Sequence, residues 1–232
     1  MTGSIILRFV CLIVGYLFGL IETGVLYGKL KGVDIRNYGS GNSGTTNALR
    51  VLGTKAGLIV FLGDFLKSLI PCLTVTFIFK NIEPYANIYQ LFVLYAGFGA
   101  VLGHNFPFYL NFKGGKGIAT TAGTIVGLLN GWMILILLIL FVAIVAATRY
   151  VSLGSILLMI EFSILYIIFA FKGMLCFGSY GTPFIKEALI ESIILVLLFA
   201  ALAIYRHKAN IKRLMAHEER KLSFHKEGEI KK

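Results

Sequence analysis

Residues 103–117, GHNFPFYLNFKGGKG, combine polar side chains with glycines that would expose the backbone to a ligand. Glycine adopts positive φ without strain, and a backbone without Cβ atoms can approach an anion closely. Lysines next to such exposed N–H groups add positive charge, which is the chemistry of a loop that binds phosphate. The alternative is a basic loop held on the cytoplasmic side of a membrane by its charge alone. The candidate ligands here are Asn105, Lys113, Gly114, Gly115, Lys116 and Gly117.

An earlier polar stretch, residues 39–53 with the sequence GSGNSGTTNALRVLG, predicts a loop that leads into a short helix. In chain order it is the first polar stretch, and residues 103–117 are the second. Hydroxyl and free N–H groups at the start of a helix bind anions, and Arg50 lies about two turns further on. The spacing of a nucleotide-binding P-loop, GxxxxGK[ST], is missing. A flexible polar linker is the alternative, but it explains Arg50 and Asn47 poorly. The candidate ligands here are Ser40, Gly41, Asn42, Thr45, Asn47 and Arg50.

A third stretch, RHKANIKRL at residues 206–214, predicts a basic helix directly after the last apolar segment. One face of this helix carries, at spacings of three and four residues, Arg206, His207, Asn210 and Arg213. The ordinary pKa of histidine suits proton transfer near neutral pH, so His104 and His207 are the candidate catalytic bases. The alternatives are a charged tail that meets anionic lipid and histidines that only donate a hydrogen bond to phosphate.

The composition identifies the class of protein that must hold these stretches. The chain has 232 residues, of which 57% are hydrophobic and 14% charged, and its mean hydropathy is +0.84. A soluble domain has about 25% charged residues, so we expect an all-α polytopic membrane bundle. The net charge of +11 then marks a cytoplasmic face, anionic lipid or an anionic substrate, and no nucleic acid is expected as a partner. We expect one transmembrane catalytic domain, residues 1–205, and a basic cytoplasmic segment, residues 206–232, whose start belongs to the site.

About seven transmembrane helices fit the apolar segments and the charges between them. Residues 118–147 contain no charge, and as one helix they would measure about 45 Å, against roughly 30 Å for a hydrocarbon core. A tight turn at Asn130-Gly131 would divide them into two short helices. The N-terminus then lies outside, the C-terminus lies in the cytoplasm, and the positive-inside rule is obeyed. The basic residues left outside are Arg8, Lys80, Lys172 and Lys186. The loops on the cytoplasmic side are 39–53, 103–117 and 149–152.

Charged side chains inside the predicted spans are candidates for function. Asp64 and Lys67 lie three residues apart on one helix face, where they could pair. Glu22 lies near the inner end of a predicted single helix, residues 4–27, and we expect it at the interface, paired with a lysine of the following loop. The three cysteines are odd in number and lack metal-like spacing, so neither a disulfide framework nor a metal site is expected.

The three polar stretches, in their order and spacing, resemble the three cytoplasmic motifs of the bacterial acyl-phosphate:glycerol-3-phosphate acyltransferases. The resemblance covers the whole chain. It implies an integral enzyme of the bacterial cytoplasmic membrane that begins phospholipid synthesis, with its active site facing the cytoplasm. Such an enzyme moves a fatty acyl group from acyl phosphate to the 1-hydroxyl of sn-glycerol 3-phosphate and gives lysophosphatidate and phosphate. Two residues depart from the motif: Ser43 stands where an apolar residue or proline is expected, and Thr45 where alanine is common.

The chemistry implied by this resemblance needs no cofactor, because an acyl phosphate is already an activated mixed anhydride. The enzyme can act by positioning two anions and stabilising charge. Ser40 and Arg50 would hold one phosphate, and the lysines and glycines of residues 113–117 the other, in an order that the sequence leaves open. The hydroxyl proton could pass to His104, to His207 or to the departing phosphate. The implied partners are membrane lipid and a peripheral enzyme that makes acyl phosphate.

An organophosphate transporter is the competing class, since it would also need a basic vestibule and helices broken by glycine. That class predicts internal repeats and polar groups near the middle of the bilayer. The sequence shows no repeat, and its polar stretches gather at one face. A lipid-binding protein without catalysis would leave the histidines and Arg50 without a role.

Overall fold

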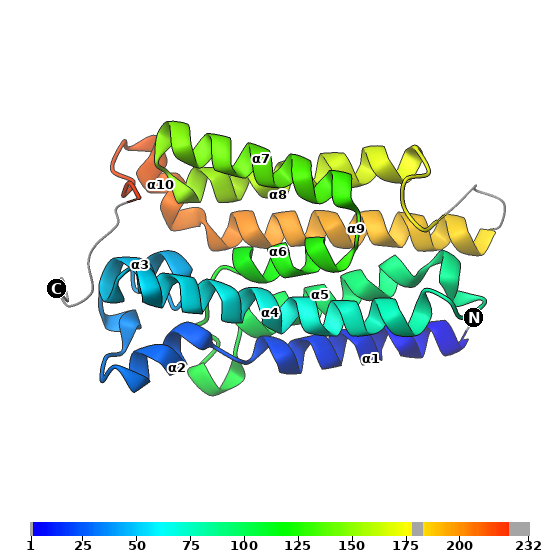
Figure 1. Cartoon of the computed structure of the whole chain (residues 1–232), viewed down its shortest axis with the longest axis horizontal. Helices are drawn as coiled ribbons and strands as arrows, with labels where there is room; N and C mark the ends of the chain where they lie inside the picture. The colour runs from blue at the N-terminus through cyan, green and yellow to red at the C-terminus, as the bar shows by residue number, and fades with distance from the viewer. Residues whose placement is uncertain (1, 178–182, 223–232) are drawn as a thin grey trace.

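The computed structural model describes residues 2–177 and 183–222, and these residues contain ten α-helices. Figure 1 shows them as one bundle, with α3 and α10 at one end and the start of α1 at the other. Residues 223–232 of the predicted cytoplasmic segment lie outside the described ranges. The bounds are α1 Thr2–Gly19, α2 Thr23–Leu30, α3 Thr45–Leu52, α4 Thr54–Phe79, α5 Tyr89–Asn105, α6 Ile118–Gly127, α7 Gly131–Thr148, α8 Val151–Phe171, α9 Pro183–Arg206 and α10 Lys208–Met215.

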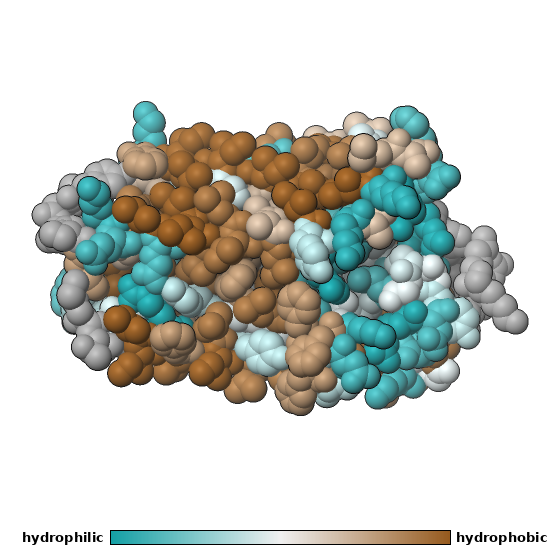
Figure 2. Space-filling view, turned by 180° about the vertical axis from the view of Figure 1, so that it is seen from behind, coloured by the Kyte–Doolittle hydropathy of each residue, from teal (hydrophilic) through white to brown (hydrophobic). Residues whose placement is uncertain are grey.

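Within the described ranges, 6 segments are long and apolar enough to cross a membrane. They are Ser4–Leu30, Thr54–Phe79, Tyr89–Leu110, Gly131–Thr148, Val151–Phe171 and Phe184–Arg206. Figure 2 shows apolar side chains covering the middle of the molecule, with hydrophilic side chains at both ends and over much of the end that carries α3 and α10. The predicted all-α membrane bundle is therefore confirmed as a class.

The predicted division of residues 118–147 into two helices is present. The side chain of Asn130 caps α7 by accepting a hydrogen bond from the N–H of Met133 at 3.0 Å, and Leu129 before it has a φ of 54°. The first of the two helices, α6, has only 10 residues, and a helix of that length rises about 15 Å, half of a hydrocarbon core. The count of seven full spans thus remains a prediction.

The predicted single helix of residues 4–27 is wrong, because α1 ends at Gly19 and α2 begins at Thr23. The break frees two backbone carbonyls inside an apolar bundle, where an unpaired polar group is costly. Side chains from other elements satisfy them: Tyr109 donates to the carbonyl of Leu20 at 2.6 Å, and Lys67 donates to that of Ile21 at 2.8 Å. The break is therefore built into the tertiary structure.

The backbones of α1 and α5 touch closely because glycines line their contact. A Cβ atom at Gly15 or Gly19 would collide with a carbonyl oxygen of α5, and one at Gly99 or Gly103 would collide with a carbonyl oxygen of α1. Both pairs are spaced by four residues, the small-residue spacing that lets membrane helices pack closely. This contact fixes the broken end of α1 against the end of α5, where the second polar stretch begins.

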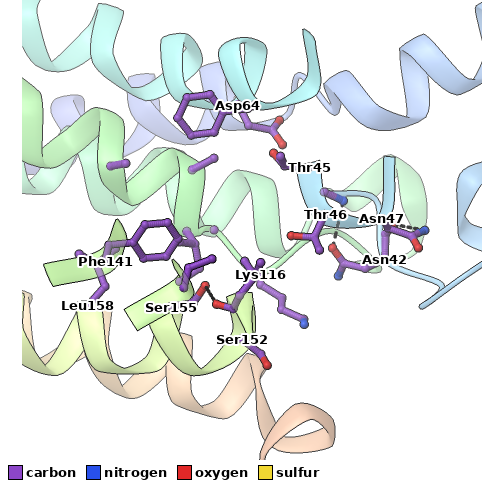
Figure 3. A pocket seen from close by; sticks show the side chains of 18 of the residues that line it. Asn42, Thr45, Thr46, Asn47, Asp64, Lys116, Phe141, Ser152, Ser155 and Leu158 are labelled. Carbon is purple, nitrogen blue, oxygen red and sulfur yellow. Dashed lines mark hydrogen bonds between the residues drawn. The ribbon is translucent and has the colours of Figure 1, made fainter. Parts of the chain in front are cut away.

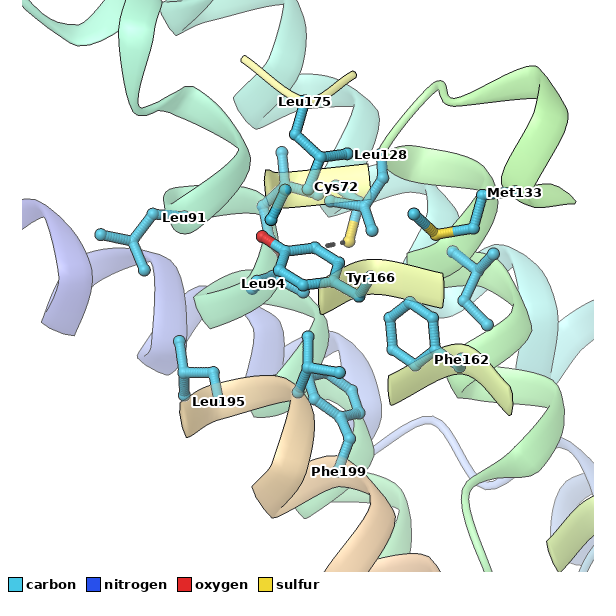
Figure 4. Packing of buried hydrophobic residues seen from close by; sticks show 14 of the residues in the cluster. Cys72, Leu91, Leu94, Leu128, Met133, Phe162, Tyr166, Leu175, Leu195 and Phe199 are labelled. Atoms are coloured by element: carbon cyan, nitrogen blue, oxygen red, sulfur yellow. Dashed lines mark hydrogen bonds between the residues drawn. The ribbon is translucent and has the colours of Figure 1, made fainter. Parts of the chain in front are cut away.

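The apolar core surrounds α5, the most deeply buried of the 6 spans found in the described ranges. Figure 4 shows Tyr166 and Phe162 of α8 in this core, together with Leu94 of α5 and Phe199 of α9. Helix α7 lies at the edge of this core and buries only Met133 and Leu137 in it, so most of its apolar surface is available to lipid.

The glycine contact between α1 and α5 predicts a stability effect. Gly15→Ala should lower the free energy of unfolding by about 1–3 kcal/mol, because the added methyl forces the two backbones apart. For a chain of this size that corresponds to a Tm lower by roughly 3–10 °C, measured by thermal unfolding in detergent. Gly131→Ala is the matched control, since a Cβ atom there meets nothing within 4 Å. An equal Tm in both variants would contradict the proposed role of the contact.

Candidate active site

A cavity of about 620 Å³ lies at the end of the bundle that carries α3 and α10. The three polar stretches and the 149–152 loop, which the sequence placed on one face, all contribute to its lining and therefore converge there. The rest of the wall comes from α4, α6, α7 and α8 and is mostly apolar, with Asp64 and Ser155 as polar exceptions. Figure 3 shows the two halves, with Lys116 and Asn42 on the polar side and Phe141 and Leu158 on the apolar side. Such a cavity fits a molecule with an anionic head and an apolar tail.

The first polar stretch forms a loop held by Asn47, which is 1% exposed. The Asn47 carbonyl oxygen accepts from the N–H of Ser40 at 2.8 Å. The Asn47 amide donates to the carbonyls of Ile35, Tyr38 and Asn42 at 2.8 to 3.1 Å. Its side chain is therefore occupied by the loop, although one edge of the residue lines the cavity. The loop leads into α3 as predicted, and Arg50 near the end of α3 also lines the cavity.

Lys116 lies where the second polar stretch enters α6. Its ammonium donates to Oδ1 of Asn210 at 2.5 Å, and the amide of Asn210 donates to Glu219 at 2.8 Å. Glu219 also accepts from Ser152 at 3.0 Å and from Arg213 at 2.7 Å. Burial, together with the neighbouring arginines, lowers the pKa of Lys116 to about 8. The lysine is thus a partly desolvated cation that an anionic ligand would stabilise.

The glycines of the second stretch do not form the expected cradle of N–H groups. The N–H of Gly115 donates to the carbonyl of His104 at 3.0 Å, and the N–H of Gly114 to that of Asn105 at 3.3 Å. Their own carbonyls accept from the guanidinium of Arg206 at 2.7 and 2.8 Å. The part of this loop that lines the cavity is instead the N-terminus of α6, where Gly117 has a φ of 78°. A helix N-terminus beside Lys116 attracts anions.

Arg206 also departs from the predicted continuous basic helix. Helix α9 ends at this residue, His207 adopts φ −95° and ψ 6°, and α10 begins at Lys208. Arg206 therefore turns toward the glycine loop, while His207 and Asn210 line the cavity. The expectation that all of these side chains share one helix face was wrong for Arg206, because the chain bends after it.

His207 is buried, with 2% exposed, and its protonation state follows from its contacts. Its Nδ1 lies 2.7 Å from the carbonyl oxygen of Ala203, and a carbonyl only accepts, so Nδ1 carries the proton. Burial and the nearby charge of Lys116 lower the pKa of His207 to about 4. At neutral pH the ring is therefore uncharged, and its Nε2 is a hydrogen-bond acceptor.

His104 is the second-last residue of α5 and contacts a buried group of charges. Its Nδ1 lies 2.9 Å from Oε1 of Glu22 and 2.7 Å from Nζ of Lys67, and Lys67 lies 2.9 Å from Oδ1 of Asp64. The predicted pair of Asp64 and Lys67 is thus confirmed. The predicted pairing of Glu22 with a lysine of the following loop is wrong, because Glu22 is only 1% exposed and points into this group. Gly115 covers the His104 ring so closely that a Cβ atom would collide with Nε2.

Most of the predicted site residues meet at the cavity. Those that line it are Ser40, Asn42, Thr45, Asn47, Arg50, His104, Lys116, Gly117, His207 and Asn210. Gly41 lines a neighbouring open groove with Arg36 and Arg220. Lys113 is exposed, and Asn105, Gly114 and Gly115 are buried without lining the cavity. Within the described ranges no three His, Cys, Asp or Glu side chains are grouped as metal ligands.

Three residues of the site were not identified from the sequence. Ser152 and Glu219 line the cavity, and Ser43 contacts Glu22. Serine is common in polar loops and helix starts, so neither serine gave a distinct pattern. Glu219 follows a run of basic residues, where a carboxylate is expected to be solvated. Its three partners come from α8 and α10, and the sequence does not show that their side chains meet at one carboxylate.

Comparison with known proteins identifies the relatives of this chain. The sequence model of a family described as Glycerol-3-phosphate acyltransferase matches residues 9–217. A curated glycerol-3-phosphate acyltransferase of Chlorobaculum tepidum is 40% identical over 222 residues, which cover 92% of this chain and 95% of the relative.

Two solved structures are similar over nearly the full length, and both are described as PlsY (YgiH), an integral membrane glycerol 3-phosphate acyltransferase. The glycerol 3-phosphate form has a TM-score of 0.76 and 34% identity, covering 93% of this chain and 96% of that one. The lysophosphatidic acid form has a TM-score of 0.73 and 33% identity, covering 92% and 94%. This chain is therefore a multi-pass membrane protein that belongs to the glycerol-3-phosphate acyltransferase family.

Proposed function

We propose that this chain transfers a fatty acyl group from acyl phosphate to the 1-hydroxyl of sn-glycerol 3-phosphate, giving lysophosphatidate and phosphate in phospholipid synthesis. The observation that carries the proposal is the single cavity that joins a cationic polar end to an apolar wall. The names of the relatives, and the two ligand forms of the PlsY structures, support this acceptor and this product. The alternative of an organophosphate transporter has no support among these relatives.

The polar end offers separate sites for two phosphate groups. Arg50 reaches the cavity from α3, whereas Lys116 and the N-terminus of α6 form a different part of its wall. Burial lowers the pKa of Arg50 as well as that of Lys116, so both cations are partly desolvated. Each would form charge-assisted hydrogen bonds to a phosphate, and the apolar wall would receive the acyl chain.

The reaction then needs positioning and a route for one proton. The hydroxyl oxygen attacks the acyl carbonyl carbon, the bond from that carbon to the phosphate oxygen breaks, and phosphate leaves with the electron pair. His207, with a pKa of about 4, is a weak base whose Nε2 would orient the hydroxyl as a hydrogen-bond acceptor. An oxygen of the phosphate group, with a second pKa of about 6, would take the proton. His104, covered by Gly115, would hold the glycine loop.

Removal of the charge of either Arg50 or Lys116 is expected to lower the activity. Arg50→Ala and Lys116→Ala should each lower kcat/KM by about tenfold to a few hundredfold, because a charge-assisted hydrogen bond contributes roughly 1.5–3 kcal/mol. Steady-state assays on purified, folded variants measure this. Lys113→Ala is the matched comparison, since that lysine is exposed and does not line the cavity, and it should stay within threefold of wild type. Unchanged turnover in both cavity variants would refute the two phosphate sites.

The lowered pKa of Lys116 predicts the alkaline limb of the pH profile. Lysine is charged below its pKa, so phosphate binding weakens as the pH rises through about 8, and kcat/KM should fall there. Lys116→Arg keeps the charge at all these pH values, so its alkaline limb should move to higher pH. Identical alkaline limbs in wild type and Lys116→Arg would show that another group titrates.

The acyl donor can be argued from a motif that the chain lacks. Many acyltransferases that use thioester donors have an HxxxxD motif, in which aspartate orients the histidine that deprotonates the acceptor. The residues at that position after the four histidines are Tyr109, Lys212, Leu222 and Ile230. A donor with its own phosphate would supply both an anion for the basic loops and a proton acceptor. Acyl phosphate therefore fits better than a thioester, and the enzyme that makes it would be the peripheral partner.

This donor assignment is tested by incubating the purified protein with glycerol 3-phosphate and one donor at a time. Palmitoyl phosphate should support turnover, whereas palmitoyl-CoA at equal concentration should give no lysophosphatidate above background. Inorganic phosphate should inhibit competitively with acyl phosphate, because it occupies the same cations. Robust acylation from palmitoyl-CoA in the absence of acyl phosphate would overturn the assignment.

The basic residues at the α3 and α10 end of the bundle also support an orientation of the protein in the membrane. The start of α1 and helix α10 lie at opposite ends of the bundle (Figure 1), which supports an odd number of crossings with α6 as the short one. The basic end would face the cytoplasm, and in a bacterium the membrane would be the cytoplasmic one.

Cysteine labelling in intact cells tests this orientation. In a cysteine-free background, a cysteine at position 80 should react with a membrane-impermeant maleimide. A cysteine at position 208 should react only after permeabilisation, although both native lysines are exposed. Labelling of position 208 from outside would reverse the orientation.

A further inference from the structure

A buried group of four charged or titratable side chains lies at the cavity, which Asp64 and His104 line, and the proposed chemistry does not use all of it. Glu22, Asp64, Lys67 and His104 are 1% to 3% exposed. They come from the break after α1, from α4 and from the end of α5. An ion pair of this kind is costly to desolvate and is weak evidence of added stability, so its position suggests another role.

The two oxygens of Glu22 contact two different walls of the active site. Oε2 accepts from the hydroxyl of Ser43 at 2.7 Å, and Ser43 is 1% exposed in the loop that leads into α3. Oε1 lies 2.9 Å from Nδ1 of His104 at the end of α5. One carboxylate thus ties the first polar stretch to the second. Ser43 is one of the positions at which the sequence departs from the motif.

Both contacts continue directly to groups that face the cavity. On one side, Ser43 precedes Gly44, the N-cap of α3, and α3 carries Arg50. On the other side, the His104 carbonyl accepts from the N–H of Gly115 at 3.0 Å, and Lys116 follows. One path between Arg50 and Lys116 therefore runs through Glu22.

The neighbours of Glu22 hold it in place. Lys67 lies 3.6 Å from its Oε1 and also donates to the freed carbonyl of Ile21 next to it in the chain. Asp64 contacts the same ammonium at 2.9 Å. The break after α1, which turns Glu22 inward, is in turn fixed by the glycine contact with α5.

We propose that Glu22 is a positioning residue that sets the separation of the two anion-binding walls. Through them it would set the distance between the acyl carbonyl and the attacking hydroxyl, so the inference rests on the proposed function. Positioning contributes strongly to reactions of this kind, and a displacement of about 1 Å can cost roughly 100-fold in rate. Each wall keeps its own cation when Glu22 is altered, so the rate should suffer more than the binding of either substrate.

The experiment compares three variants with wild type. Glu22→Gln removes the charge at nearly constant volume, and Ser43→Ala removes only the contact with the first loop. Glu191→Gln is the matched control, because Glu191 forms an ion pair with Arg8 at 2.7 Å and accepts from Tyr95 at 2.5 Å, among residues that do not line the cavity. Each variant is assayed per folded molecule for kcat, for both KM values and for Tm.

The expected result is a split between kcat and KM. Glu22→Gln should lower kcat by about 30- to 100-fold while both KM values stay within about threefold, and Ser43→Ala should lower kcat by about three- to tenfold. Glu191→Gln should lower Tm but keep kcat within twofold. A normal kcat in Glu22→Gln, or an equal kcat loss in Glu191→Gln, would overturn the inference. If Glu22→Gln fails to fold, a normal kcat in Ser43→Ala would overturn the inference.

A distance measurement separates this inference from the proposed function. Spin labels at positions 37 and 113, both exposed and outside the cavity, report the separation of the two loops without any substrate. Wild type and Glu191→Gln should give one narrow distance distribution, and Glu22→Gln and Ser43→Ala should give a broader or shifted one. Unchanged distances would refute the positioning role even if the enzyme is active. An inactive wild type with broadened variants would refute the proposed function alone.

Discussion

The contact between Glu22 and His104 joins the break after α1 to the end of α5 and, through Ser43, to the loop before α3. In an apolar bundle every freed backbone group must find a partner within the protein. The break is tolerated because Tyr109 and Lys67 satisfy the carbonyls that it frees. The close glycine contact of α1 with α5 then brings the carboxylate within reach of the imidazole.

The cavity joins two different environments. Its polar end contains cations that burial has partly desolvated, as the lowered pKa values of Lys116 and Arg50 indicate. Such cations are costly in the absence of an anion, and an anionic ligand offsets that cost. Its other walls come from membrane helices whose outer faces are apolar (Figure 2). An amphipathic phospholipid precursor matches both parts at once.

The carboxylates at the site organise its cations and do not cancel them. Glu219 holds Asn210, Arg213 and Ser152, and Asn210 in turn accepts from Lys116. Glu22 holds the two loops from below. Four cations, Arg50, Lys116, Arg213 and Arg220, line the cavity together with two carboxylates, Asp64 and Glu219, so positive charge is in excess there.

The sequence by itself determined the membrane class, most of the spans, the loop into α3, the turn before α7 and the three polar stretches. Each of these depends on local composition or on spacing within one segment. The tertiary structure decided the partner of Glu22, the turn of Arg206 toward the glycine carbonyls, the exposure of Lys113 and the network around Glu219. These features depend on contacts between residues far apart in the chain. The spacing of residues along a sequence cannot specify them, because it fixes the face of a helix but not the helix that packs against that face.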